Sequence, residues 1–161
     1  MKKLFFIVLA ASLVTAAVLF AAGQENLHEK MHEMMMQQGG PMPDTRTELK
    51  MPEPMKVMHK KIMREHMTTL SEITAALATN DLNKAADVAK ARLGWNQTEE
   101  KRCSMIEQIT GEKDFLTLGK AVHMKADELS EAAKAGKRDI ALATLSELIN
   151  NCNACHNKYR H

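Results

Sequence analysis

Apolar residues recur every three or four positions along much of this 161-residue chain, which is the spacing of one face of a helix. The pattern begins after Pro52 and Pro54, a residue type that the first turn of a helix tolerates. We expect a first helix from about Met55, ended by Thr79-Asn80-Asp81, a sequence that also suits the cap of a following helix. The apolar face of this first helix carries Met63, Met67, Leu70, Ile73 and Leu77.

The same pattern predicts three further helices. The second, ended by Gly94, has an apolar stripe made of Leu82, Ala85, Ala86, Ala89 and Leu93. The third, ended by Gly136, has a stripe made of Phe115, Leu118, Val122, Ala126, Leu129 and Ala133. The fourth begins at Asp139 and continues to the end of the chain, with Ile140, Leu142, Leu145, Leu148, Ile149, Cys152, Cys155, His156 and Tyr159. Residues 95–111 either extend the second helix or form a short helix of their own, and the pattern leaves both open.

Helices joined by short connections pack antiparallel to their neighbours. We therefore predict an all-α protein whose residues 51–161 form an up-down-up-down four-helix bundle. The chain has one Trp and one Tyr, so Leu, Met, Ala or a prosthetic group must supply much of the core volume.

The first 23 residues have the character of a leader. Lys2 and Lys3 precede an apolar stretch over residues 4–22, and Ala21 and Gly23 have the spacing of a cleavage site. These features predict a signal peptide and a periplasmic protein. The apolar stretch also approaches the ~20 residues that span a bilayer, so an uncleaved N-terminal membrane anchor is the alternative. Removing the leader leaves 20 basic and 20 acidic residues, a balance that argues against nucleic acid as a partner.

Residues 24–50 are poor material for a core, and Gly39, Gly40, Pro41 and Pro43 break any helix near the end of this stretch. The segment is rich in thioether and imidazole groups, contributed by His28, Met31, His32, Met34, Met35 and Met36. These groups suit copper, and the soft sulfurs favour Cu(I). Metal ligands need fixed geometry, however, and nothing in this sequence imposes it. We therefore expect a flexible linker, with a copper site as the alternative.

The last helix holds a Cys-x-x-Cys-His motif made by Cys152, Cys155 and His156. Two thiols at this spacing can attach to the vinyl groups of a haem, and the adjacent histidine can bind its iron. A disulfide between the two thiols is the competing interpretation in an oxidising compartment. A redox-active Cys-x-x-Cys usually lies in a βαβ context, which this chain lacks, so haem attachment is favoured. Cys103 is left over, as a buried small hydrophobe or as a link between two chains.

This motif at the end of a helical bundle resembles the class II cytochromes c, the cytochrome c-prime family. Those proteins also end in Cys-x-x-Cys-His-x-x-Tyr-Arg, which here is the run 152–160. Residues 113–160 are similar to the last two helices of the cytochrome b562 family, which has a cysteine at neither position. The resemblance covers about 51–161 and is weaker around 95–111. It implies one covalent haem c near the C-terminal helix, and it leaves a homodimer open.

The resemblance also implies that the first helix supplies the second iron ligand. Residues 66–72 are similar to the ligand-bearing turn of the cytochrome b562 family, which places Met67 at the ligand position. Met63, one turn earlier on the same face, is the second choice, and His66, beside that face, is the third. An alignment with c-prime sequences would instead place Lys60 there, and a lysine is costly to bury.

Four other residues around the expected haem carry predictions. Arg160 is expected to pair with a haem propionate, because a guanidinium matches a carboxylate geometrically. Tyr159 is expected to pack near the ring. His59 and His123 are expected to be exposed or satisfied by hydrogen bonds.

Methionine and histidine together raise the reduction potential of a haem iron, which suits electron transfer. We therefore predict an exported monohaem c-type cytochrome that carries electrons and is not an enzyme. Its partners would be periplasmic or membrane redox proteins. If no residue binds opposite His156, the alternative is a five-coordinate, c-prime-like protein that binds nitric oxide or carbon monoxide.

Overall fold

The computed structural model describes residues 29–37, 39 and 43–161. Apart from two short strands, the regular structure of these residues is helical, which confirms the predicted all-α class. The chain divides into two compact units, with the boundary between Thr45 and Arg46. The predicted signal peptide and membrane anchor, and His28, lie outside the described residues. Within the described ranges, no helix combines the length and hydrophobicity needed to cross a membrane.

The second unit begins at Arg46, earlier than the predicted start of the bundle at Met51. Strand β1 (Thr47–Glu48) pairs in parallel with strand β2 (Tyr159–Arg160). The backbone N–H of Leu49 donates to the Arg160 carbonyl at 2.8 Å, and the Leu49 side chain is 1% exposed. Tyr159 was expected to continue the face of the last helix. It instead adopts an extended backbone, because pairing with β1 satisfies groups that the helix end leaves free.

The first long helix of this unit, α2 (Glu53–Ala78), starts and stops close to the predicted positions. Pro52 occupies the N-cap, as the missing N–H of proline allows. After Ala78 the chain turns through Asn80, whose φ of 60° is in the left-handed region. The Asp81 carboxylate then accepts a hydrogen bond from the Lys84 backbone N–H at 3.1 Å. The predicted stop and cap are both confirmed.

Residues 95–111 form a helix of their own, which settles the alternative that the sequence left open. Helix α3 (Leu82–Leu93) ends at Gly94, and α4 (Gln97–Thr110) begins after Asn96, whose side chain caps it. Gly94 has a φ of −63°, so a left-handed turn is not the reason for the glycine. A Cβ there would lie 2.5 Å from the Asp127 carboxylate and 2.5 Å from the Lys90 carbonyl oxygen. Glycine is needed at position 94 because the Asp127 carboxylate and the Lys90 carbonyl oxygen lie too close to leave room for a Cβ.

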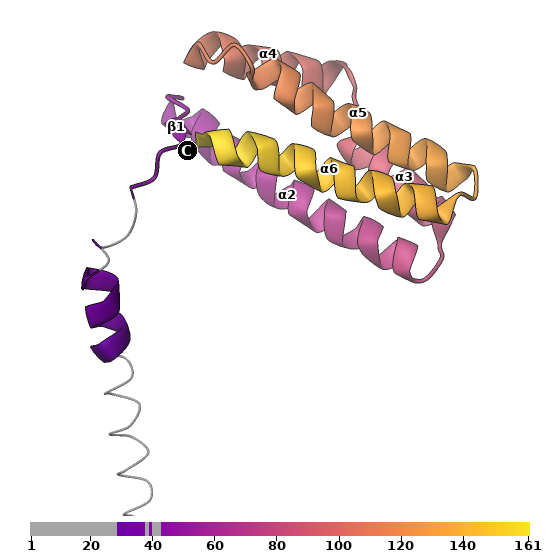
Figure 1. Ribbon diagram of the computed structural model, residues 1–161. Helices are drawn as coiled ribbons and strands as arrows, with labels where there is room; N and C mark the ends of the chain where they lie inside the picture. The colour runs from indigo at the N-terminus through magenta and orange to yellow at the C-terminus, as the bar shows by residue number, and fades with distance from the viewer. Residues whose placement is uncertain (1–28, 38, 40–42) are drawn as a thin grey trace, which may run out of the picture. The chain divides into compact units, whose positions relative to one another are not determined.

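Helices α5 (Phe115–Lys134) and α6 (Arg138–Lys158) complete the fold. Helix α3 packs between α2 and α5, and α5 also contacts α4 and α6 (Figure 1). The shared core is formed by alanines that allow close packing and by larger side chains, among them Ile73, Leu77, Leu93, Leu129 and Leu148. Each large side chain contributes about 1.5–3 kcal/mol by leaving water.

The apolar face of α6 differs in part from the predicted one. Leu145 and Leu148 are buried as expected, whereas Ile140 and Ile149 are 53% and 38% exposed. Ala141 instead faces the core, and it is fully buried. Small side chains at such positions let α6 lie close to α5, with which it shares its most extensive contact.

Candidate functional site

The core is divided by a cavity of about 650 Å³ between α2 and α6, two helices that make few close contacts with each other. Its volume lies in the range of small-molecule and cofactor sites. Its walls are mostly apolar and come from α2, α4, α5 and α6, through Ile62, Leu70, Ile106, Phe115, Val122 and Ile149. The main core cluster borders it on one side, and a smaller cluster that includes Leu49 and Tyr159 borders it on the other.

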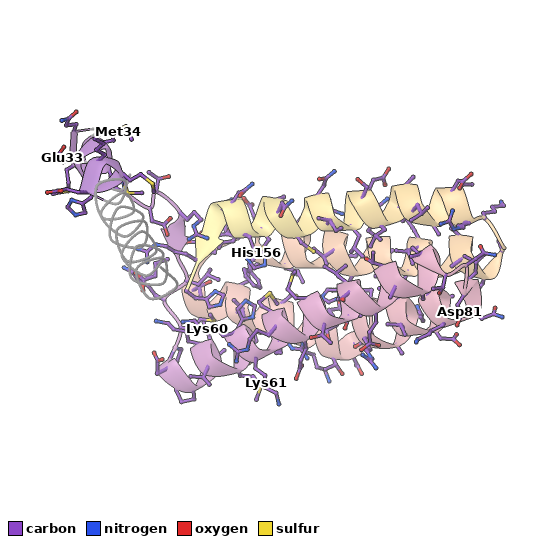
Figure 2. All side chains as sticks on the ribbon, turned by 90° about the horizontal axis from the view of Figure 1, so that it is seen from below. Glu33, Met34, Lys60, Lys61, Asp81 and His156 are labelled. Atoms are coloured by element: carbon purple, nitrogen blue, oxygen red, sulfur yellow. The ribbon has the colours of Figure 1, made fainter. Side chains whose placement is uncertain are left out.

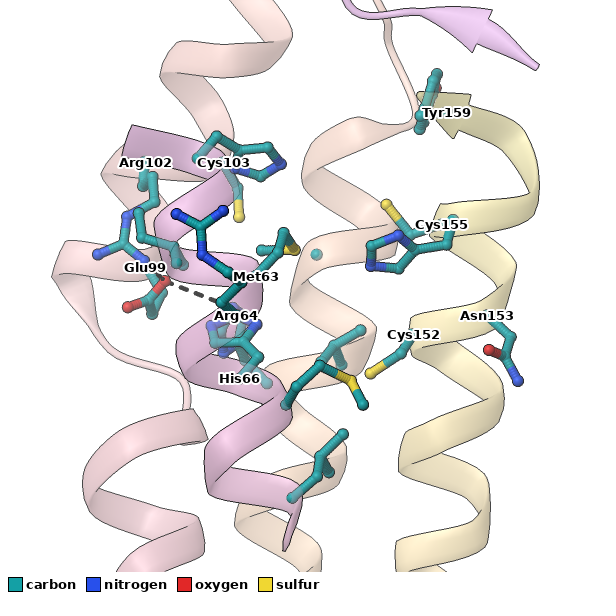
Figure 3. A pocket seen from close by; sticks show the side chains of 18 of the residues that line it. Met63, Arg64, His66, Glu99, Arg102, Cys103, Cys152, Asn153, Cys155 and Tyr159 are labelled. Carbon is teal, nitrogen blue, oxygen red and sulfur yellow. Dashed lines mark hydrogen bonds and ion pairs between the residues drawn. The ribbon is translucent and has the colours of Figure 1, made fainter. Parts of the chain in front are cut away.

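Both cysteines of the Cys-x-x-Cys-His motif border this cavity. Residues three apart on a helix share a face, so α6 presents the Cys152 and Cys155 thiols together. Figure 3 shows both pointing toward α2, while Asn153 points to the other side of α6. Both thiols are free, and burial raises the pKa of Cys152 and raises that of Cys155 to about 11. They are therefore held as neutral thiols.

His156 lies on the same side of α6 as the two thiols. It borders the cavity, and Figure 2 shows its side chain between α6 and α2. Its backbone carbonyl accepts a hydrogen bond from Arg46 at 3.2 Å. The three motif residues that the sequence singled out thus lie together on one wall.

Helix α2 brings two methionines to the facing wall. Met63 is half-buried and points toward the motif cysteines in Figure 3. Met67 is 66% exposed, and it also borders the cavity. The structure therefore places both proposed ligands at the site, and the choice between them stays a prediction. Lys60, from the competing alignment, is exposed and is not part of the cavity wall.

Two histidines on α2 line the cavity as well, and both are held neutral. Burial is the main reason that the pKa of His59 falls from 6.5 to about 4, and the nearby His161 adds to it. The pKa of His66 also falls to about 4, through burial first and then through His123. The His59 side chain is 8% exposed, and its Nδ1 has no hydrogen-bond partner among the described residues. The expectation that His59 is exposed or hydrogen-bonded is wrong at this nitrogen, because the helix face that carries Met63 turns it inward.

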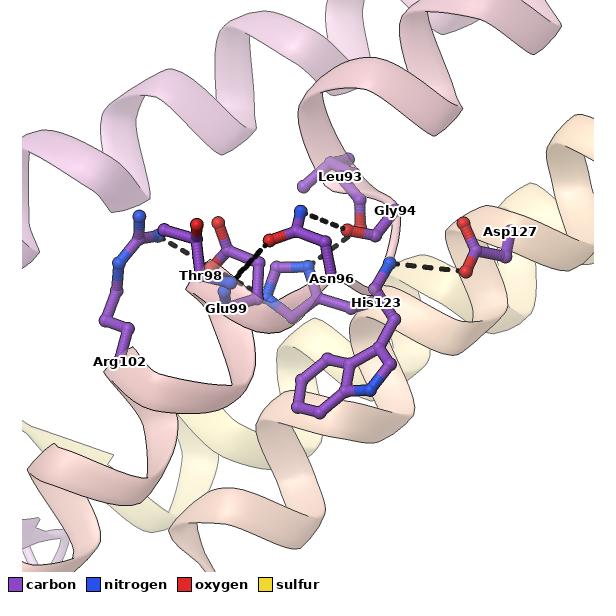
Figure 4. A network of polar contacts seen from close by, with 9 residues as sticks. Leu93, Gly94, Asn96, Thr98, Glu99, Arg102, His123 and Asp127 are labelled. Carbon is purple, nitrogen blue, oxygen red and sulfur yellow. Dashed lines mark hydrogen bonds and ion pairs between the residues drawn. The ribbon is translucent and has the colours of Figure 1, made fainter.

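His123, in contrast, is satisfied as expected. Its Nδ1 lies 2.7 Å from the Leu93 carbonyl oxygen, and its Nε2 lies 3.5 Å from the Glu99 carboxylate. Glu99 in turn accepts a hydrogen bond from Arg102 at 2.7 Å (Figure 4). This network fixes the junction of α3 and α4 against α5, and its side chains form one polar section of the cavity wall.

The structure gives Arg160 partners outside the cavity. Its Nη2 lies 3.4 Å from the Glu48 carboxylate, and its Nε donates to the Arg46 carbonyl at 3.3 Å. Arg160 is not part of the cavity wall, so the predicted pairing with a propionate does not fit this arrangement. The reason is the extended backbone that pairs with β1, in which successive side chains point to opposite sides. Tyr159 and His161 border the cavity, and Arg160 between them does not. Arg64 and Arg102 border the cavity instead, and no pattern in the sequence predicted either position.

Cys103 and Gly119 meet at the wall formed by α4 and α5. Cys103 is buried, and burial, followed by the charge of Glu99, raises its pKa to about 11. This burial fits the first of the two roles left open for it, a small hydrophobe. A Cβ on Gly119 would lie 2.6 Å from the Cys103 sulfur. The glycine therefore makes room for this thiol.

Comparison with known proteins identified no relative of this chain. No protein-family model matches the chain, and neither a curated protein nor a solved structure matches it significantly. The site therefore rests on its own geometry: a thiol pair and a histidine on one wall of an apolar cavity, with methionines on the other.

Proposed function

We propose that this chain is a c-type cytochrome that holds one haem covalently through Cys152 and Cys155, with His156 as an iron ligand. The observation that carries the proposal is the placement of all three motif residues on the wall of a cavity of about 650 Å³. A Cys-x-x-Cys-His motif on a solvent-facing helix surface would not support it. The alanine-rich core and the single Trp of the sequence are consistent with a group that fills this space.

The proposed architecture is an antiparallel, up-down-up-down bundle of α2, α3, α5 and α6, with α4 inserted in the longer link. The short connections after α2 and after α5 support it. Such a bundle places the cofactor between its first and last helices. The sparse contact between α2 and α6 is what that arrangement requires.

The residues present fit a haem chemically. Apolar side chains line most of the cavity, free thiols point inward, and Arg64 lies at its border with an exposed guanidinium. The group would supply an iron that cycles between the ferric and ferrous states. The His156 imidazole would hold one side of that iron, and the Met67 or Met63 thioether would hold the other. The arginine would pair with a carboxylate at the cavity border.

If His156 and a methionine of α2 both hold the iron, the group would transfer electrons, and we propose this role rather than catalysis. A thioether and an imidazole raise the potential and leave little geometry to change between redox states. We propose that the protein works in the periplasm, with periplasmic or membrane redox proteins as partners. A homodimer remains part of the hypothesis that comes with the family resemblance.

One observation favours a second function. Met67 is 66% exposed, so its thioether is not held in place by packing. If it does not bind the iron, one axial position stays open, and the protein would bind nitric oxide or carbon monoxide, as the c-prime family does.

Two experiments on the full chain, expressed with a c-type cytochrome maturation system, test these proposals. Haem staining after denaturing electrophoresis should mark the wild type and be lost in the Cys152→Ser/Cys155→Ser double variant. The ferrous spectrum should be low-spin and unaffected by carbon monoxide in the wild type. Met67→Leu should become high-spin, with Met63→Leu unchanged. Met58→Leu is the matched control, because Met58 is an exposed methionine on α2 that does not border the cavity.

The outcomes separate the hypotheses. If haem staining does not mark the wild type, covalent attachment of the haem is refuted. A wild type that binds carbon monoxide would replace the electron carrier with the gas binder. A spectral change in Met63→Leu alone would identify Met63, one turn earlier on α2, as the iron ligand instead of Met67.

A further inference from the structure

The short helix over residues 29–37 exposes an unusual surface. Its four methionines, Met31, Met34, Met35 and Met36, are 51%, 53%, 66% and 65% exposed. Exposed apolar side chains that occur singly need no explanation, but four on nine residues of helix do. The sequence predicts a flexible linker here, because nothing in the sequence imposes geometry on these thioethers. The helix supplies that geometry.

Helical spacing places three of the methionines on one face. Successive residues are about 100° apart around a helix, so Met34 and Met35 lie one turn after Met31 and on either side of it. The Cβ atoms of residues spaced in this way lie about 5–6 Å apart. Each methionine side chain has three rotatable bonds, so the three sulfurs can converge on one point. Met36 falls on a different side, about 140° around the helix from Met31.

Charged groups occupy the remaining surface. Glu29, Lys30 and Glu33 cluster on the side opposite Met35, and Figure 2 shows Glu33 and Met34 projecting from the helix in different directions. His32 flanks the methionine face. The helix is therefore amphipathic, and every apolar side chain on it is a thioether.

This composition favours a soft metal ion over an apolar contact. Helices that bind membrane surfaces use Trp, Phe and Leu on their apolar face, and residues 29–37 contain none of these. The described residues also contain no group of three or more His, Cys, Asp or Glu placed to hold a metal ion, so harder cations have no comparable site there. Soft thioether sulfur favours Cu(I) over the harder cations that oxygen ligands hold.

We propose that the helix over residues 29–37 binds one Cu(I) ion through the thioether sulfurs of Met31, Met34 and Met35. Binding needs no oxidation or proton release, because a thioether is a neutral ligand. The site does not rest on the proposed haem function, since all three residues lie in the first unit of the chain. It adds a metal-binding activity to a protein whose proposed centre lies within Arg46–His161.

The test is a Cu(I) competition titration against a chromophoric chelator such as bathocuproine disulfonate, under anaerobic conditions. The full chain carries Cys103→Ser, Cys152→Ser and Cys155→Ser in every sample, so that no thiol competes for Cu(I) whether or not a haem is attached. The variants are Met31→Leu/Met34→Leu/Met35→Leu and the matched control Met36→Leu. Leucine keeps the size and the helix propensity of methionine, and circular dichroism checks that helix content is unchanged.

The parent protein is expected to take one equivalent of Cu(I) from the chelator. The triple variant should bind at least tenfold more weakly, and Met36→Leu should match the parent. X-ray absorption of the copper-loaded parent should show sulfur neighbours. No uptake by the parent, full uptake by the triple variant, or equal loss in Met36→Leu would each overturn the proposal. Binding to anionic lipid vesicles without copper uptake would identify the face as a membrane contact and would overturn it too.

Discussion

The buried imidazole of His59 makes a sharp prediction about pH and stability. The folded state holds the pKa of this group at about 4, against 6.5 for an ordinary histidine. Burial is the main cause, and positive charge on His161, His156 and Arg102 adds to it. Phe115 packs 5.8 Å from the ring and offers no acceptor for a proton. Protonation of His59 therefore opposes folding.

The direction and the size of the pH effect on stability follow from the difference between the folded and unfolded pKa of His59. Between pH 6.5 and about 4, the unfolded chain binds a proton at this position and the folded chain does not, so stability falls as the pH falls. Above pH 6.5 both states are neutral, and the group has no effect. A shift from 6.5 to about 4, at 1.36 kcal/mol per pKa unit, corresponds to a loss of about 3 kcal/mol once the pH is below 4.

Urea unfolding of haem-free protein, followed by circular dichroism at intervals from pH 7.5 to 4, measures this effect. His59→Leu removes the titrating group and puts an apolar side chain of similar size in its place. His66, whose pKa is lowered chiefly by burial and then by His123, stays in both proteins. The free energy of unfolding should fall by about 3 kcal/mol more in the wild type than in His59→Leu over this range. Parallel pH profiles for the two proteins would refute the assignment of His59 as a buried neutral group.

Two further predictions concern packing. Gly94→Ala should reduce the free energy of unfolding by about 1–3 kcal/mol although the φ of Gly94 suits any residue, because the new Cβ would meet the Asp127 carboxylate and the Lys90 carbonyl oxygen. Thermal unfolding measures this cost, and a neutral result would show that the contact relaxes freely. Leu129→Ala should cost about 2–5 kcal/mol in urea unfolding, because Leu129 is fully buried in the main core cluster. A cost below 1 kcal/mol would mean that the core around α5 is loosely packed.

Local features of this protein could be predicted from the sequence, because their causes lie within a few residues. The helix end at Asn80 and the cap at Asp81 depend on neighbours within one turn. The shared face of Cys152 and Cys155 follows from a spacing of three on a helix. The all-α class follows from the same periodicity, summed over the whole chain.

Other features depend on segments that are distant in the sequence, and only the tertiary structure decided them. Arg160 turns to Glu48 because β1 pairs with the chain end, and no local pattern near Arg160 specifies that pairing. The Nδ1 atom of His59 lacks a hydrogen-bond partner among the described residues because of what packs around α2, whereas the neighbours of His59 in the sequence, Met58 and Lys60, are exposed. Gly94 is needed because Asp127 on α5 approaches it.

The sequence by itself determined which residues of this protein are candidates for attaching and binding a cofactor, because that prediction depends on residue type and local spacing. The tertiary structure decided that these residues border a cavity, since the cavity exists only where α2 and α6 stand apart. It also decided that Met63 and Met67 both reach the facing wall. The helix over residues 29–37 likewise brings Met31, Met34 and Met35 to one face. Ligand geometry is set by packing between elements and by the regular backbone, neither of which composition specifies.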